Sequence, residues 1–103
     1  MNSDFKLIDW RTEPAERIGI KSITKIKHLP TGHIVVIEDQ QSDPTKQTFI
    51  NKVRVIDESG YVLFTAPTDS IISYVTEYLQ LSDEDAKTAK KVIMDLRQEA
   101  RCS

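Results

Sequence analysis

The stretch Phe49–Phe64, with the sequence FINKVRVIDESGYVLF, constrains the fold of this chain more than any other segment. In its first half Val53 and Val55 share one parity, while Lys52 and Arg54 share the other. An apolar residue at every second position is typical of a β-strand with one buried face. The stretch therefore predicts a strand whose opposite face carries cations.

The polar cluster Asp57–Gly60 divides this stretch, and the apolar run Tyr61–Phe64 follows it. Two β-rich runs joined by a polar segment that ends in glycine are typical of a β-hairpin. The run Ile34–Ile37 is apolar at every position, which predicts a central strand covered on both faces. Together the patterns predict a four-stranded antiparallel meander, with strands near residues 20–29, 33–39, 47–57 and 61–66.

The segments around these strands are less regular. Residues 4–11 alternate weakly, which predicts a short strand or an arm that lays Trp10 over the core. A proline and a glycine within residues 12–19 favour one or two helical turns there. In residues 20–29 an apolar side chain recurs at every third position, which predicts a bulge or bend in the strand. The polar segment Glu38–Gln47 predicts a loop or a wide hairpin connection.

Two helices are predicted after the sheet. Residues 68–70 offer capping side chains, and the first helix then carries the apolar stripe Ile71, Ile72, Val75 and Leu79. A second helix is expected to begin at Ser82, with a narrow seam of Ala86, Ala89, Ile93, Leu96 and Ala100. The predicted fold is α+β, with a four-stranded antiparallel sheet and two C-terminal helices packed on one face. The alternative is a partly closed small β-barrel with two helices.

Composition limits the classes of protein to which the chain can belong. Its 103 residues fit a single domain, 1–103, that buries roughly two-thirds of its unfolded surface. The net charge of −2 lacks the strong positive excess of a dedicated nucleic-acid-binding domain. With one cysteine, no signal-peptide pattern and no long apolar run, the sequence favours a cytoplasmic protein.

The sequence contains no motif of a known catalytic chemistry. Its three glycines form no phosphate-binding loop, and no nucleophile stands at a recognisable spacing from a base. We therefore predict that the protein is not an enzyme and uses neither a cofactor nor a metal.

The strongest candidates for contact with another protein lie in the helical part of the chain. Tyr74, Tyr78 and Leu81 fall at positions i, i+4 and i+7 on the flank of the first helix, and Met94 lies on the second. Tyrosine is enriched at interfaces because it combines apolar area with a hydrogen-bonding tip. These residues predict a small non-enzymatic binding protein, such as an accessory subunit or inhibitor, that acts on another protein. The small-residue seam of the second helix also suits a homodimer.

Two alternative functions rest on other residues. The cations Lys25, Lys27, Lys52 and Arg54 predict a basic sheet face that binds nucleic acid weakly, although exposed aromatic residues for base stacking are not interleaved with them. His28 and His33 flank the turn Leu29–Gly32 and would face each other across a hairpin, which suits a metal-dependent sensor or a small enzyme. No third ligand lies near this pair in the sequence.

Overall fold

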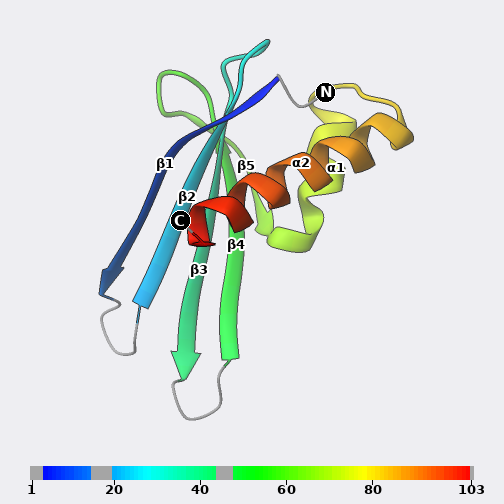
Figure 1. Ribbon diagram of the computed structural model, residues 1–103. Helices are drawn as coiled ribbons and strands as arrows, with labels where there is room; N and C mark the ends of the chain where they lie inside the picture. The colour runs from blue at the N-terminus through cyan, green and yellow to red at the C-terminus, as the bar shows by residue number, and fades with distance from the viewer. Residues whose placement is uncertain (1–3, 15–19, 44–47, 103) are drawn as a thin grey trace.

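The computed structural model describes residues 4–14, 20–43 and 48–102 (Figure 1). Five strands come first, followed by a single 3₁₀ turn and two α-helices. The elements are β1 (Phe5–Pro14), β2 (Ile20–His28), β3 (Ile34–Asp43), β4 (Thr48–Ile56), β5 (Val62–Pro67), η1 (Thr68–Ser70), α1 (Ile71–Glu77) and α2 (Asp83–Cys102).

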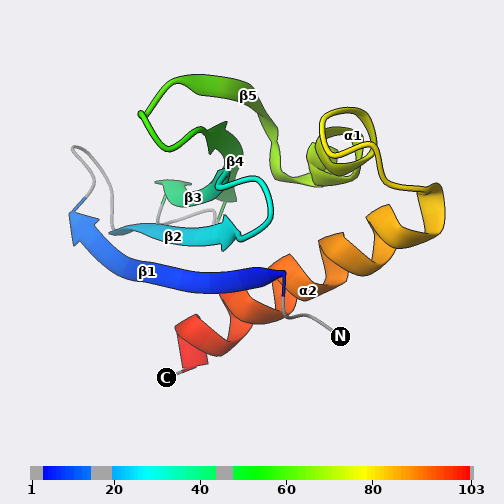
Figure 2. The same ribbon diagram turned by 90° about the horizontal axis from the view of Figure 1, so that it is seen from above.

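The strands that the structure describes form one antiparallel sheet in the order β1-β2-β3-β4-β5. Each strand pairs with its neighbours in the sequence, and β1 and β5 remain as edges, so the sheet is an open meander and not a closed barrel. Seen from above, α2 runs beside β1, and α1 follows β5 after the short turn η1 (Figure 2). The predicted α+β fold with two C-terminal helices is confirmed, but the sheet has five strands, not four.

The additional strand is β1, which pairs along its whole length with β2. Leu7 lies opposite Ile26 and Trp10 lies opposite Thr24, because the register shifts by one residue between them. This β-bulge turns residues of opposite parity to the same face, which explains why the alternation in the sequence is weak. The predicted bulge in residues 20–29 is therefore wrong, since β2 pairs with β3 without a register shift. The predicted helical turn is wrong for residues 12–14, which belong to β1, and its remainder lies outside the described residues.

A second correction concerns the polar segment that follows Ile37. The predicted loop is wrong for residues 38–43, which continue β3, while residues 44–47 lie outside the described part of the chain. Polar side chains are accommodated in this part of β3 because a hydrogen-bond donor lies on each face of the sheet. Glu38 accepts a hydrogen bond of 3.0 Å from Arg54 on one face, and Asp39 accepts one of 2.9 Å from Arg97 of α2 on the other.

The connection between β4 and β5 forms at the predicted place. The Asp57 carboxylate accepts hydrogen bonds from the Ser59 amide at 2.9 Å, the Ser59 hydroxyl at 2.6 Å and the Tyr61 amide at 2.9 Å. These donors, the Ser59 hydroxyl first, lower the pKa of Asp57. Gly60 adopts φ +94°, a conformation that glycine accepts without a steric penalty. Local side-chain chemistry is sufficient to form this turn.

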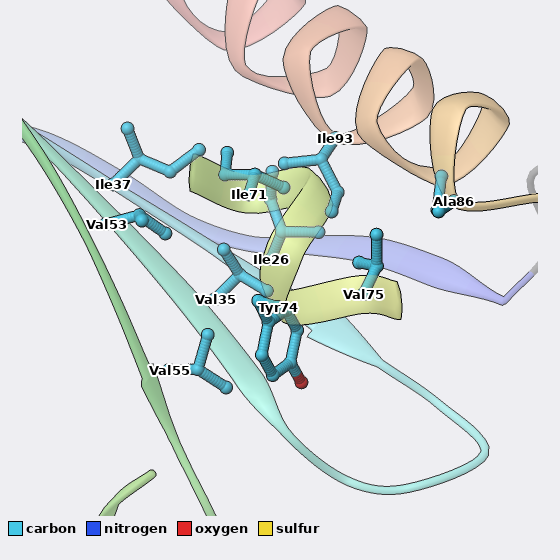
Figure 3. Packing of buried hydrophobic residues seen from close by; sticks show 11 residues of the cluster. Ile26, Val35, Ile37, Val53, Val55, Ile71, Tyr74, Val75, Ala86 and Ile93 are labelled. Carbon is cyan, nitrogen blue, oxygen red and sulfur yellow. The ribbon is translucent and has the colours of Figure 1, made fainter. Parts of the chain in front are cut away.

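Pairing divides the sheet side chains into two sets, since paired residues on adjacent strands share a face. The helix-covered face supplies one half of the core, and both helices supply the other (Figure 3). Burying one large aliphatic side chain contributes about 1.5–3 kcal/mol, so this cluster dominates stability. The buried members are Ile26, Val35, Ile37, Val53, Val55, Ile71, Tyr74, Val75, Ala86, Ala89 and Ile93. We call the opposite set of side chains the open face.

The helices begin close to the predicted positions. The Ser82 hydroxyl accepts a hydrogen bond of 3.2 Å from the amide of Asp85, which caps the first turn of α2. Three acidic residues in that turn complement the positive end of the helix dipole. The seven-residue α1 is too short to be stable alone, so its buried residues hold it on the sheet. Neither described helix has the length and hydropathy that a membrane span requires.

Candidate functional site

The turn between β2 and β3 holds His28, Thr31 and His33 at one end of the sheet, and the Tyr74 hydroxyl of α1 reaches His33 there. The turn is closed by hydrogen bonds of 2.8 Å from the His28 amide to the His33 carbonyl and from the Gly32 amide to the His28 carbonyl. Gly32 adopts φ +78° and packs against the side chain of Glu58. A Cβ atom at this position would lie 2.1 Å from Glu58 Oε1, so a side chain there requires movement of Glu58. The β2–β3 and β4–β5 turns are thus in contact.

His28 is buried beside the start of β1. Its Nδ1 atom lies 2.7 Å from the Thr31 hydroxyl oxygen, and its ring centroid lies 4.8 Å from that of Phe5. Burial lowers the pKa of His28, Asp4 opposes this by raising it, and His33 lowers it further. The neutral imidazole is therefore the favoured form near pH 7.

His33 has a different partner. Its Nδ1 atom lies 2.9 Å from the hydroxyl of Tyr74, and the direction of that hydrogen bond depends on the imidazole tautomer. Tyr74 is fully buried, and burial raises the pKa of its hydroxyl, which stays neutral. Each histidine is thus held by its own hydroxyl partner. Among the described residues, no group of three or more histidine, cysteine or acidic side chains is placed to hold a metal ion.

An aromatic cluster extends from Tyr74 towards solvent. The ring of Tyr78 stacks on that of Tyr74 with centroids 5.7 Å apart, and both rings contact Phe64, at 5.9 Å from Tyr78 and 5.5 Å from Tyr74. Tyr78 is nevertheless 49% exposed. Its contacts fix the ring while one side remains accessible to a partner.

A cavity of about 290 Å³ lies where the start of β1, the end of β2 and the first turns of α2 meet. Aromatic and aliphatic side chains line it together with two carboxylates, those of Asp4 and Asp85. Leu81, in the segment between the helices, forms part of its wall. The lining residues are Asp4, Phe5, His28, Leu81, Asp85, Thr88, Ala89 and Val92. We call this cavity together with Tyr78 the helix-end site.

The structure separates the residues that the sequence grouped for protein binding. Tyr78 is exposed and does not line the cavity, whereas Leu81, three residues further along the chain, forms part of its wall. Tyr74 lies in the core, where it supports Tyr78 and presents no surface of its own. Met94 is half-buried against the core and does not line the cavity. A role in binding therefore remains a prediction for Tyr78 and Leu81.

The four cations of the alternative nucleic-acid hypothesis all lie on the open face. Lys25 and Arg54 flank Val36 in one cross-strand row, and Lys27 lies in the next row. Lys52 of β4 lies opposite Glu38 of β3 in the strand register. Arg54 also donates to Glu38, which neutralises part of its charge.

Apart from Leu81 and His28, sequence patterns singled out none of the cavity residues as a candidate for binding. Phe5 and Asp4 come from the N-terminal segment, whereas Asp85 and Thr88 belong to α2. They meet only because β1 and α2 pack beside the same end of β2. No pattern in the N-terminal segment predicts this contact, because residues that line a pocket from distant segments have no characteristic spacing in the sequence.

No protein-family model, curated protein or solved structure matches this chain.

The buried His28 is expected to make stability depend on pH. Because the folded protein lowers the pKa of His28 below its ordinary 6.5, the unfolded chain binds the proton more readily. The neutral imidazole therefore contributes to the free energy of unfolding above the ordinary pKa of 6.5. This contribution is lost as the pH falls through the lower pKa of the folded protein. Urea unfolding at about pH 7.5 and about pH 5.5 measures the difference, since these values bracket the ordinary histidine pKa.

The variant His28→Gln is expected to lose this part of the pH dependence, because it removes the buried titrating group. His33→Gln is the matched control and is expected to keep most of it. If His28→Gln retained the full slope, burial of His28 would not be its cause.

Proposed function

We propose that the protein is a non-enzymatic binding protein that recognises another protein through the helix-end site. The observation that carries this proposal is the cavity with Leu81 in its wall, which follows the half-exposed Tyr78 by three residues in the chain. A volume of about 290 Å³ is close to the lower limit of small-molecule pockets, which are about 300–1,000 Å³. Such a cavity suits one or two side chains of a protein partner.

The rigidity of Tyr78 supports this role. Its ring packs against Tyr74 and Phe64, and Tyr74 is itself held by His33. An aromatic side chain that is ordered before binding loses little conformational entropy in the complex. Rigid tyrosines with an accessible side are typical hot spots of protein interfaces.

The charges around the cavity indicate the chemistry of the partner. Asp4 and Asp85 line it, and Asp83 and Glu84 belong to the same first turn of α2. The buried His28 is neutral near pH 7 and does not offset these carboxylates. A partner segment that combines an apolar side chain with a lysine or arginine is complementary to this surface.

Both alternatives have weaker support. Glu38 binds Arg54 and lies 3.6 Å from Lys21, which reduces the positive charge that nucleic acid would meet on the open face. In the described part of the chain, neither imidazole is hydrogen-bonded to a carboxylate that would orient it as a catalytic base. The absence of catalysis, the cytoplasmic location and the homodimer remain predictions from the sequence.

Replacing Tyr78 with alanine is expected to weaken partner binding by about tenfold or more, the usual effect of losing an aromatic anchor. Affinity-tagged chain is incubated with lysate of the source cells, with and without nuclease treatment, and the retained proteins and nucleic acids are quantified. The partner identified in this way is then titrated calorimetrically against each variant.

Tyr61→Ala is the matched control, because Tyr61 is 70% exposed and does not line the cavity. It is expected to retain the partner with unchanged affinity. Equal binding by Tyr78→Ala and the parent chain would refute the helix-end site as the interface. Loss of all retained material on nuclease treatment would instead favour nucleic acid as the ligand.

A further inference from the structure

The open face of the sheet is separate from the helix-end site, whose strand residues Phe5 and His28 lie on the opposite face. The pairing pattern places its side chains in rows that cross all five strands. Both helices pack on the other face, and no described helix covers this one. The first row is Lys6, Lys27, Ile34, Ile56 and Val62, and the second is Asp9, Lys25, Val36, Arg54 and Thr65.

Positive charge on this face is only partly neutralised. Glu38 is the carboxylate that engages Arg54 and Lys21. Lys6, Lys25 and Lys27 form no ion pair with any side chain that the structure describes. Asp9 lies opposite Lys25 in the register and offsets part of this charge. The lysines still repel one another, so carboxylates of a partner would relieve that repulsion.

Aliphatic side chains continue the first row beyond the lysines. Ile34 and Ile56 are half-buried, and Val62 is 47% exposed at the end of the row. In the next row Val36 is only 2% exposed, although it lies outside the core cluster under the helices. In its first row, the open face thus combines aliphatic side chains on β3–β5 with lysines on β1 and β2.

We propose that the open face binds an acidic polypeptide segment, whose aliphatic side chains cover Ile34, Ile56 and Val62 while its carboxylates meet the lysines of β1 and β2. Charge complementarity selects an anionic partner. The aliphatic row selects a polypeptide over nucleic acid, because bases bind sheets by stacking on aromatic rings. The aromatic residues Phe5 and Phe64 of this sheet pack against the core on the other face.

Fluorescence anisotropy with labelled peptides of defined composition tests the proposal on the full chain. The main probe alternates glutamate and leucine over about eight residues, enough to span five strands spaced about 4.8 Å apart. The comparison probes are a glutamate–serine peptide, a lysine–leucine peptide and an oligothymidylate of equal charge. The glutamate–leucine peptide is expected to bind most tightly.

Charge reversal locates the site. Lys25→Glu/Lys27→Glu is expected to weaken binding of the glutamate–leucine peptide by about tenfold or more, because it replaces several attractive charge pairs with repulsive ones. Lys87→Glu/Lys91→Glu makes the same charge change on exposed positions of α2 and is expected to leave affinity within about twofold. Val62→Ser is expected to weaken binding of the glutamate–leucine peptide but not that of the glutamate–serine peptide.

Three results would overturn the proposal. Tighter binding of oligothymidylate than of the glutamate–leucine peptide would make the open face a nucleic-acid surface. An equal loss of affinity for the glutamate–leucine peptide in the two charge-reversal variants would show that the net charge of the protein, and not the open face, governs binding. Failure of every acidic peptide to bind would remove the surface as a docking site, with circular dichroism confirming that each variant is folded.

Discussion

Replacing Arg97 with alanine is expected to lower the free energy of unfolding by about 3–5 kcal/mol, because it leaves a buried carboxylate without its counter-charge. Arg97 of α2 donates to Asp39 of β3 through Nε, at 2.9 Å, and through a second guanidinium nitrogen. The side chains are only 12% and 9% exposed, respectively. Both bonds go to Oδ2, whereas the buried Oδ1 of Asp39 has no hydrogen-bond partner among the described residues.

Chemical unfolding of paired variants separates the loss of the pair from the loss of one partner. The double variant Arg97→Met/Asp39→Leu is expected to be nearly as stable as the parent chain or more stable, since apolar residues of similar volume avoid the desolvation cost of two charges. Lys91→Ala removes an exposed pair with Asp95 at 3.9 Å and is expected to change stability by about 0.5 kcal/mol or less. An effect of Arg97→Ala as small as that of Lys91→Ala would contradict the buried pair.

Replacing Tyr74 with alanine is expected to cost about 3–5 kcal/mol, the usual range for deleting a large aromatic side chain from a core. Tyr74 is fully buried and points from α1 towards the sheet (Figure 3). Its ring contacts those of Phe64 and Tyr78. Truncation would leave a cavity at the centre of the core and remove the ring on which Tyr78 stacks. The truncation would therefore destabilise the protein and also leave Tyr78 of the helix-end site without the ring that holds it in place.

Tyr74→Phe isolates the contribution of the hydroxyl group. It keeps the ring but removes the hydrogen bond to His33, so a loss of about 0.5–1.5 kcal/mol is expected. Tyr78→Ala serves as the comparison at a half-exposed position and is expected to cost less than Tyr74→Ala. Urea unfolding of the three variants at neutral pH checks the order. Equal decreases in the free energy of unfolding for Tyr74→Ala and Tyr78→Ala would contradict a larger role of Tyr74 in the core.

Local patterns predicted much of the fold. The period of two in the stretch Phe49–Phe64, together with Asp57 and Gly60, placed one hairpin because neighbouring residues alone decide its geometry. The cap at Ser82 and the stripes of the two helices were recognisable for the same reason. The α+β class followed from the order of these elements.

The candidate site was only partly predictable. The sequence singled out Tyr74 and Tyr78 together because they are one helical turn apart, yet Tyr74 points into the core and Tyr78 remains accessible. It also paired His28 with His33, whereas the fold gives each histidine a different hydroxyl partner. Side-chain spacing identifies neighbours on an element, but burial depends on what packs against it.

The sequence by itself determined the elements whose cause is local, namely the β4–β5 hairpin, the cap at Ser82 and the apolar stripes of the helices. The capping side chains expected in residues 68–70 form no cap hydrogen bond. The tertiary structure alone decided the extent of β1, where a bulge hides the alternation, and of β3, whose polar end remains a strand. It also decided the cavity of the helix-end site. The physical reason is distance along the chain: Asp39 finds its counter-charge at Arg97, 58 residues away, and no local pattern records such a partner.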